Sequence, residues 1–255
     1  ALLLGQTGLG LADRNTVSGV VRAWHALEQL RRQGEPPAEK VREGGSPGEI
    51  AWIEHPLSDR LDEDSPLTRE TLRARACAFR LATGARLVFS DGAPDVIAYP
   101  EDRAGWGRLC RLLTTGNLRA PPRGTRAVKG ECRLLFEDLT NDASGLLLIV
   151  MPPRRLAGLE ETLQRLAQAA PGAVWLGAAM SRRGDDARRL EKLKAVSART
   201  GVPLIAVNDA LYHVAEQRDL QDVMTCIREG VTIETAGRLL EANATTGKVV
   251  LRVAS

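Results

Sequence analysis

The sequence predicts an α/β protein, and three observations support that class. Short apolar runs alternate with longer segments whose apolar residues recur at helical spacing. About six such strand and helix units follow one another, which favours a barrel, although this periodicity fits a doubly wound sheet as well. At 255 residues the chain is long enough for one large domain and short for two. We therefore expect a mainly parallel sheet covered by helices.

The individual elements follow from local pattern. Each predicted strand is a short, largely apolar run, and each predicted helix carries apolar residues three or four positions apart. The strands are expected at 9–12, 86–89, 96–99, 146–151, 174–178 and 204–207. The helices are expected at 16–30, 67–81, 103–115, 156–169, 185–200 and 220–229. Residues that directly follow a strand become candidates for function, because α/β proteins place ligand-binding groups at the carboxyl ends of their strands.

Two segments interrupt this alternation. Residues 33–66 are rich in proline, glycine and acidic side chains, so we expect a long surface insertion that is poorly ordered and dispensable for folding. Residues 118–130 contain the run Arg-Ala-Pro-Pro-Arg-Gly-Thr-Arg and have no periodicity, which predicts a mobile loop.

The composition is that of an ordinary globular protein, with 44% hydrophobic and 26% charged residues. No stretch approaches the roughly 20 apolar residues of a membrane span, and the first residues lack the basic region of a signal peptide. We therefore expect a cytoplasmic protein with no membrane partner. Four cysteines lie far apart without a Cys-x-x-Cys pair, which argues against a structural zinc site and against a disulfide framework.

The positive charge is unevenly distributed. Residues 103–133 hold eight arginines or lysines against one glutamate, whereas residues 31–70 hold six basic and ten acidic side chains. Such asymmetry indicates a nucleic-acid or acidic partner, and a solvated arginine-rich surface explains it equally well. The nucleic-acid-binding candidates are Arg103, Arg108, Arg111, Arg119, Arg123, Arg126 and Lys129.

Several familiar catalytic patterns do not fit. The run Gly-Gln-Thr-Gly-Leu-Gly at 5–10 precedes a strand instead of following one, so it cannot hold phosphate at a helix start. No Gly-x-Ser-x-Gly nucleophile elbow occurs. The acidic run 62–64 has the charges for two magnesium ions, but it lies in the proline-rich segment, where a solvated acidic run is the better interpretation.

Five blocks of sequence carry a family resemblance. They are residues 12–21 (Ala-Asp-Arg-Asn-Thr-Val-Ser-Gly-Val-Val), 99–114, 129–132 (Lys-Gly-Glu-Cys), 145–153 and 208–244. Together they resemble the PHP (polymerase and histidinol phosphatase) domain that opens bacterial C-family DNA polymerases. Within that family they are similar to the error-prone, damage-inducible branch of the polymerase III alpha subunits.

The resemblance implies a distorted (β/α) barrel, seven-stranded when complete, with its N-terminal strand missing here. It implies a PHP domain over 1–244, including the insertion, and a tail or linker over 245–255. The whole protein so implied is a template-directed DNA polymerase used in translesion synthesis after DNA damage, with magnesium at carboxylates outside this segment. Its implied partners are the other polymerase domains and DNA, and the sliding clamp and accessory mutagenesis proteins are further candidates. No cofactor is expected for the fragment itself.

The metal ligands of the family are largely replaced. The chain has only three histidines, and the opening His-x-His is absent. Asp13-Arg14 stands where the family has Asp-His, Arg86 where it has Glu, and Asp95 where it has His. Pro152 and Pro153 stand near the expected Cys. The last motif keeps Asn208 and Asp209, but Leu211 takes the His position and His213 is displaced by two.

We therefore expect Asp13 and Asp209 to lie near each other, with Arg14 or Arg86 within ion-pair reach. His213 is a displaced ligand or, more commonly for such a residue, a hydrogen-bonded structural histidine. The fragment is then a non-catalytic scaffold with a degraded metal site. The alternative is a metal-dependent phosphoesterase that trims DNA 3′ ends, which would require residual metal binding.

Overall fold

The computed structural model describes residues 1–2, 5–33, 39–41, 51–53, 68–121, 131–180, 184–210 and 218–233. The described chain divides into two compact units. Unit 1 is formed within Ala1–Leu9 and Gly19–Leu81, and unit 2 within Gly10–Ser18 and residues 82–251.

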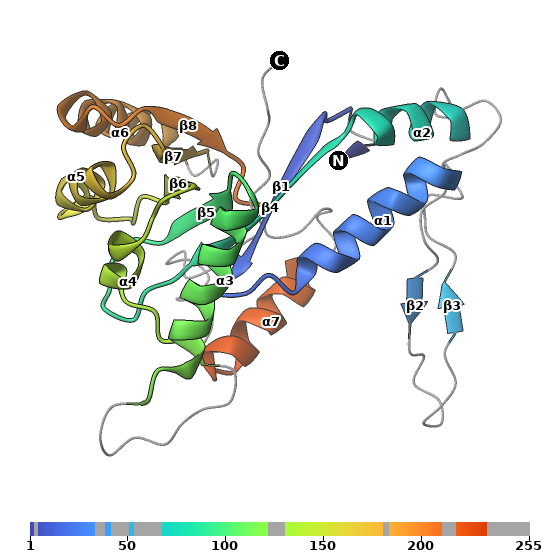
Figure 1. Ribbon diagram of the computed structural model, residues 1–255, viewed down its shortest axis with the longest axis horizontal. Helices are drawn as coiled ribbons and strands as arrows, with labels where there is room; N and C mark the ends of the chain where they lie inside the picture. The colour runs from blue at the N-terminus through green and yellow to red at the C-terminus, as the bar shows by residue number, and fades with distance from the viewer. Residues whose placement is uncertain are drawn as a thin grey trace. The chain divides into compact units, whose positions relative to one another are not determined.

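Unit 2 is built on a curled sheet of six strands (Figure 1). Their order across the sheet is β1-β4-β5-β6-β7-β8. The bounds are β1 (Gly8–Arg14), β4 (Arg80–Leu87), β5 (Val96–Pro100), β6 (Leu146–Val150), β7 (Val174–Ala179) and β8 (Leu204–Val207). This curled sheet with its helices confirms the predicted α/β class and is compatible with a distorted barrel that lacks a strand.

The sheet is mixed. The expectation of a mainly parallel sheet was wrong for strand β5 in the middle of the sheet. Strand β5 runs antiparallel to both β4 and β6, whereas β6, β7 and β8 are parallel. For the pair β4 and β5, the physical reason is the length of their connection. Only residues 88–95 join these strands, which is too short for a crossover helix and suits an antiparallel pair.

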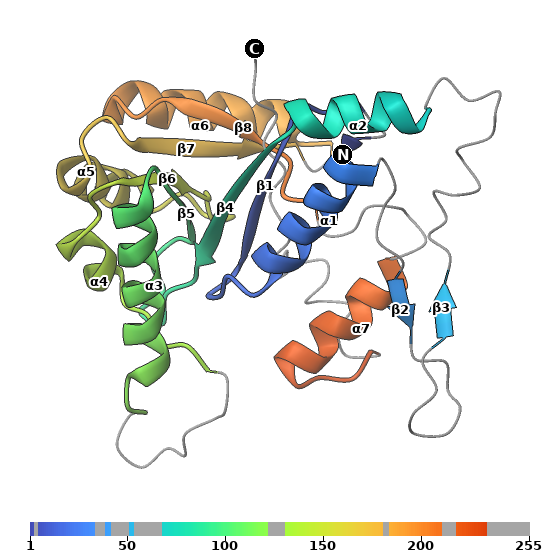
Figure 2. The ribbon, with the colours of Figure 1, turned by 45° about the vertical axis from the view of Figure 1, so that its right-hand side comes forward.

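Helices cover one face of this sheet (Figure 2). They are α3 (Arg103–Leu118), α4 (Phe136–Asn141), α5 (Leu159–Ala169) and α6 (Asp186–Thr200), and the unit also contains α7 (Arg218–Glu229). Fully buried leucines from these helices, among them Leu109 and Leu163, pack on strand residues such as Leu176 of β7. Helix α4 was not predicted, because six residues are too few to show helical periodicity.

The opposite face of the sheet carries a second, smaller apolar cluster, which includes Ile97, Tyr99 and Ile149. Side chains alternate between the two faces of a strand. Ala85 and Leu87 belong to the helix-covered core, so Arg86 between them projects from the opposite face. This face, at the ends of the strands, is where the candidate site lies.

Unit 1 contains two helices, α1 (Gly19–Gln33) and α2 (Arg69–Ala78), packed on each other through Leu27, Ala76 and Phe79. The Arg31 side chain strengthens this contact, since its Nε donates to the Ala76 carbonyl at 3.0 Å and its Nη2 to the Phe79 carbonyl at 3.1 Å. These carbonyls lie at the end of α2, where a cation compensates groups left without helical partners.

The predicted helix 67–81 ends too late and the predicted strand 86–89 begins too late. Helix α2 ends at Ala78 and β4 already starts at Arg80, whose backbone N–H donates to the Thr7 carbonyl at 3.0 Å. Residues 79–81 are Phe-Arg-Leu, of which arginine and leucine are good helix formers, so local propensity predicted helix. Pairing with the neighbouring strand overrides that weak preference.

Part of the predicted insertion 33–66 is ordered into a strand pair. Strands β2 (Glu39–Val41) and β3 (Ala51–Ile53) are antiparallel, with Lys40 opposite Trp52. The sequence predicted no strand here, because three residues are too short to show alternation. The remainder of the insertion and most of 118–130 lie outside the described residues.

Candidate functional site

The ends of several strands meet at one edge of the sheet in unit 2. Asn15, directly after β1, receives the Val88 N–H at 2.8 Å through its Oδ1 and donates from Nδ2 to the Val88 carbonyl at 3.0 Å. Its backbone N–H also donates to the Arg86 carbonyl at 2.9 Å. Beside them, the Met151 N–H at the end of β6 donates to the Asp95 carbonyl at 2.8 Å. These bonds bring segments distant in sequence to one place.

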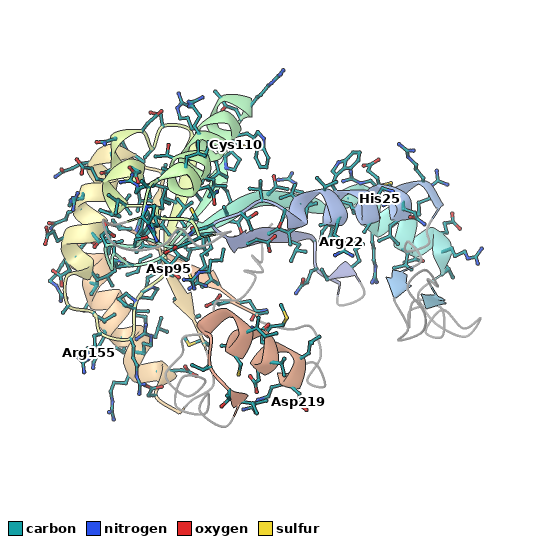
Figure 3. All side chains as sticks on the ribbon, turned by 90° about the horizontal axis from the view of Figure 1, so that it is seen from below. Arg22, His25, Asp95, Cys110, Arg155 and Asp219 are labelled. Carbon is teal, nitrogen blue, oxygen red and sulfur yellow. The ribbon has the colours of Figure 1, made fainter. Side chains whose placement is uncertain are left out.

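At this edge Arg86 joins two carboxylates. Its Nε donates to Asp95 Oδ2 at 2.8 Å, and its Nη1 donates to Asp209 Oδ1 at 2.9 Å. Arg86 is only 7% exposed. The side chains of Asp95 and Asp209 are 22% and 23% exposed, so the guanidinium is buried beneath two carboxylates that reach solvent. Asp95 lies at the centre of unit 2 in Figure 3.

The backbone is specialised at two points of this edge. Asn15 and Asp209 have φ values of 48° and 44°, and they are the non-glycine residues with positive φ in the described chain. Asparagine and aspartate tolerate this left-handed conformation better than other residues with a side chain. The turn after β8 therefore suits an aspartate at 209, whose carboxylate then meets Arg86.

The structure tests the predicted site residues unequally. The expected ion pair between Arg86 and Asp209 forms, and Asp95 joins it as a second carboxylate. Asp13 is half-buried near the end of β1, and Arg14 is exposed and lies next to Asn15 in sequence; both have interaction partners. The proximity of Asp13 to Asp209 stays a prediction, and His213 lies outside the described residues.

The described residues at this edge do not fit a metal centre. Nowhere in the described part of the chain do three or more His, Cys, Asp or Glu side chains form a group that could hold a metal ion. Arg86 is a permanent cation without a lone pair to offer, and it hydrogen-bonds the two carboxylates that could act as ligands. Chemically, the arrangement is a buried cation compensated by two anions.

Sequence reasoning missed Tyr99, which lies toward the other end of β5 from Asp95. Its hydroxyl is buried and has no hydrogen-bond partner among the described residues. Burial raises the pKa of Tyr99, because the phenolate would lose its hydration. Although the block 99–114 begins at this residue, nothing in the sequence shows that its hydroxyl is buried, since an apolar run with one tyrosine is an ordinary strand.

Most of the described nucleic-acid-binding candidates are already paired with carboxylates. Arg108 Nε lies 3.0 Å from Asp142 Oδ1, and Arg119 Nη2 lies 2.6 Å from Asp138 Oδ1. Arg111 is 4.0 Å from Asp142, and Arg103 is exposed at the start of α3. Arg123, Arg126 and Lys129 lie outside the described residues. The sequence could not distinguish paired from unpaired arginines, because their partners come from helix α4 and the turn after it.

A second group of arginines was not predicted. Arg154 and Arg155 lie in the connection after β6, from which they are separated by Met151-Pro152-Pro153, and Arg188 and Arg189 lie in the first turn of α6. Two consecutive arginines after a buried strand were a signal that could have identified the position, since strand ends commonly carry function in α/β folds. None of the helices in the described part combines the length and apolar character that a membrane crossing requires.

Comparison with known proteins shows that the chain is similar in sequence to DNA polymerases. No protein-family model matches it. It is 44% identical over 243 residues to an error-prone DNA polymerase of Rhodopseudomonas palustris (strain BisB5), covering 94% of this chain and 17% of the relative. Error-prone DNA polymerases of Bradyrhizobium sp. (strain ORS 278) and Brucella suis are 41% and 40% identical, covering 94% of this chain and 17% and 18% of theirs.

The chain therefore spans about one sixth of the length of these relatives. The similarity extends over nearly all of the chain, which confirms the predicted resemblance to error-prone DNA polymerases. It is the similarity of a segment to part of a larger protein.

Proposed function

We propose that this chain is the PHP domain of an error-prone DNA polymerase that serves translesion synthesis and damage-induced mutagenesis. In this proposal the domain is a non-catalytic scaffold for the other polymerase domains. The similarity to error-prone DNA polymerases supports the first part. The second part rests on one structural observation, the guanidinium of Arg86 bonded to both Asp95 and Asp209.

The proposal explains the unusual composition of the strand edge. A hydrolytic metal centre holds cations between carboxylates and keeps an open position for water or substrate. In this chain the carboxylates are held by a side-chain cation that is covalently part of the fold and provides no open coordination position. Asp13, Arg14, Arg86, Asp95, Asp209 and His213 are then the remaining positions of a degraded metal site.

The chemistry of the whole protein would lie elsewhere. Nucleotidyl transfer uses carboxylates and magnesium on a rigid palm domain, which this proposal assigns to other parts of the polymerase. Within such a protein, acting in the cytoplasm on DNA, this domain would contribute surfaces for the neighbouring domains. The sliding clamp and accessory mutagenesis proteins are further candidate partners for those surfaces.

The decisive experiment measures metal content and nuclease activity of the purified 255-residue chain. We expect well under one manganese or zinc ion per chain by elemental analysis. We also expect no shortening of a 5′-labelled primer in the presence of manganese and absence of nucleotides. Metal-dependent shortening that disappears in Asp209→Asn would overturn the scaffold and support the alternative, a metal-dependent phosphoesterase acting on DNA 3′ ends.

A matched variant separates loss of the site from loss of fold. Asp142→Asn removes a carboxylate of the same kind, paired with Arg108 at the end of α4 and away from the strand edge. Any genuine activity of the strand edge should survive this change. Circular dichroism of both variants checks that the fold is kept.

A further inference from the structure

We propose that unit 2 binds the phosphate backbone of duplex DNA through an outer basic patch, formed by Arg154, Arg155, Arg188 and Lys192. The first two residues lie in the connection after β6, and the other two lie four positions apart on α6, hence on one face of that helix. The inference rests on the proposed DNA polymerase identity and goes beyond it, because a scaffold needs no DNA contact of its own.

The patch carries positive charge that the described chain does not neutralise. All four side chains are exposed, and none forms an ion pair with any described residue. Two carboxylates on or near α6 are engaged elsewhere: Glu191 Oε1 lies 2.8 Å from Lys194, and Glu160 Oε1 lies 2.6 Å from Arg199. Asp185 and Asp186 precede Arg188 in sequence, and no ion pair joins either of them to the four cations among the described residues. Exposed cations that have no protein partner attract small anions from solution. A polyanion such as DNA can displace these small anions when it binds.

This property distinguishes the patch from the basic stretch nominated by sequence. There, Arg108 and Arg119 already hold carboxylates at 3.0 and 2.6 Å. A phosphate would have to compete with those carboxylates before it could gain an arginine contact. Among the described residues, the uncommitted positive charge is therefore greater at the outer basic patch.

Arg189 fixes the backbone on which part of the outer basic patch lies. Its Nη2 donates to the carbonyls of Pro152 at 2.9 Å and Pro153 at 3.0 Å, and its Nη1 donates to the Arg154 carbonyl at 3.3 Å. The connection after β6 is thereby fastened to the first turn of α6. The backbone of Arg154 is thereby held by the residue that follows Arg188, and Figure 3 shows Arg155 at the outer side of the unit. Fixing the backbone lowers the entropy that binding would otherwise cost.

The chemistry of these groups suits a phosphate backbone. Arginine presents a planar fork that matches two phosphate oxygens, and three of the four residues are arginines. Contacts from such flexible, exposed side chains position a protein on DNA without reading its sequence. We therefore expect binding that is independent of base sequence and steeply dependent on salt.

The test uses the 255-residue chain and a fluorescein-labelled 20-base-pair duplex, with binding followed by anisotropy between 50 and 200 mM salt. In Arg155→Gln/Arg188→Gln the slope of log affinity against log salt should fall by about two. Affinity at the lowest salt should fall about tenfold or more. Lys194→Gln/Arg199→Gln removes the same charge from α6 but takes cations that are already paired, so its slope should change by less than one.

The outcomes separate the alternatives. Equal effects of the two double variants would show that only net charge matters and would overturn the patch. An unchanged slope in Arg155→Gln/Arg188→Gln, or no binding by the parent chain, would overturn it as well. Arg155→Lys/Arg188→Lys should retain most of the salt slope. The nuclease and metal measurements on the same protein test the scaffold separately. Failure of one proposal can therefore be distinguished from failure of the other.

Discussion

Arg86 shows how a single residue can set the character of a site. A buried guanidinium is costly unless its hydrogen bonds are met by anions, and here Asp95 and Asp209 meet two of them. Because those carboxylates come from different parts of the chain, the ion pairs also fasten the start of β5 and the end of β8 to β4. The same contacts that occupy the carboxylates therefore stabilise the edge of the sheet.

We expect Arg86→Met to lower the free energy of unfolding by about 3 kcal/mol, because it leaves two partly buried carboxylates without their cation. Arg86→Lys should lose less, since an ammonium keeps the charge but cannot match both carboxylates with the same geometry. Urea unfolding of the three proteins at pH 7 measures the difference. Equal stability of Arg86→Met and the parent would show that the ion pairs contribute nothing.

Tyr99 provides a prediction about alkaline pH. Its folded-state pKa is raised by burial above the ordinary value of 10.0. The neutral phenol is thus stabilised by folding, and this stability is present below pH 10 and lost as the pH rises above it. Tyr99→Phe should be within about 1 kcal/mol of the parent at pH 7, since the hydroxyl has no hydrogen-bond partner in the part of the chain that the structure describes. Between pH 10 and 11 the parent should lose about 1 kcal/mol more than the variant.

At the scale of elements, close contact between α3 and the turn before β6 depends on a glycine. A Cβ built on Gly105 would collide with the backbone carbonyl of Gly145. Two residues later, a Cβ on Gly107 would meet only the end of the Arg111 side chain at 3.6 Å. The two glycines share a helix but differ in what surrounds them.

Alanine at these two positions should therefore have opposite effects. Gly105→Ala should destabilise by about 2 kcal/mol, because backbone must move to relieve the overlap. Gly107→Ala should stabilise by up to about 1 kcal/mol, because alanine favours the helix and the site has room. Thermal unfolding followed by circular dichroism measures both changes. The same sign for both variants would contradict the packing of α3 described above.

At the scale of the whole molecule, the packing of α1 on α2 in unit 1 uses residues that lie outside the insertion 33–66. Helices α1 and α2 meet through Leu27, Ala76 and Phe79, and Arg73 Nε donates to the Arg31 carbonyl at 3.1 Å. These residues all lie outside 33–66. The insertion thus connects two helices that pack on each other through residues outside the insertion.

Replacing residues 34–67 by a flexible glycine and serine linker of about ten residues should leave the fold intact. We expect the thermal midpoint to change by less than about 4 °C, which corresponds to roughly 1 kcal/mol for a chain of this size. A shorter linker is also easier to close entropically. A fall of many degrees would show that the insertion, including the pair β2 and β3, packs on the rest of the chain.

The sequence by itself determined the α/β class, most of the strands and helices, and the expectation that Arg86 lies within ion-pair reach of Asp209. Apolar periodicity reports which local segments bury a face, and the family resemblance drew attention to Arg86, Asp95 and Asp209. The start of β4, the helix α4 and the strands β2 and β3 were missed, because short elements and strand pairing leave little local pattern.

Only the tertiary structure decided which charges meet. It paired Arg86 with both Asp95 and Asp209, which are 9 and 123 residues away in sequence. It also paired Arg108 and Arg119 with carboxylates while leaving Arg155 and Arg188 exposed without an ion pair among the described residues. The physical reason is that an ion pair forms over a few ångströms of space, and distance along the chain does not predict that separation.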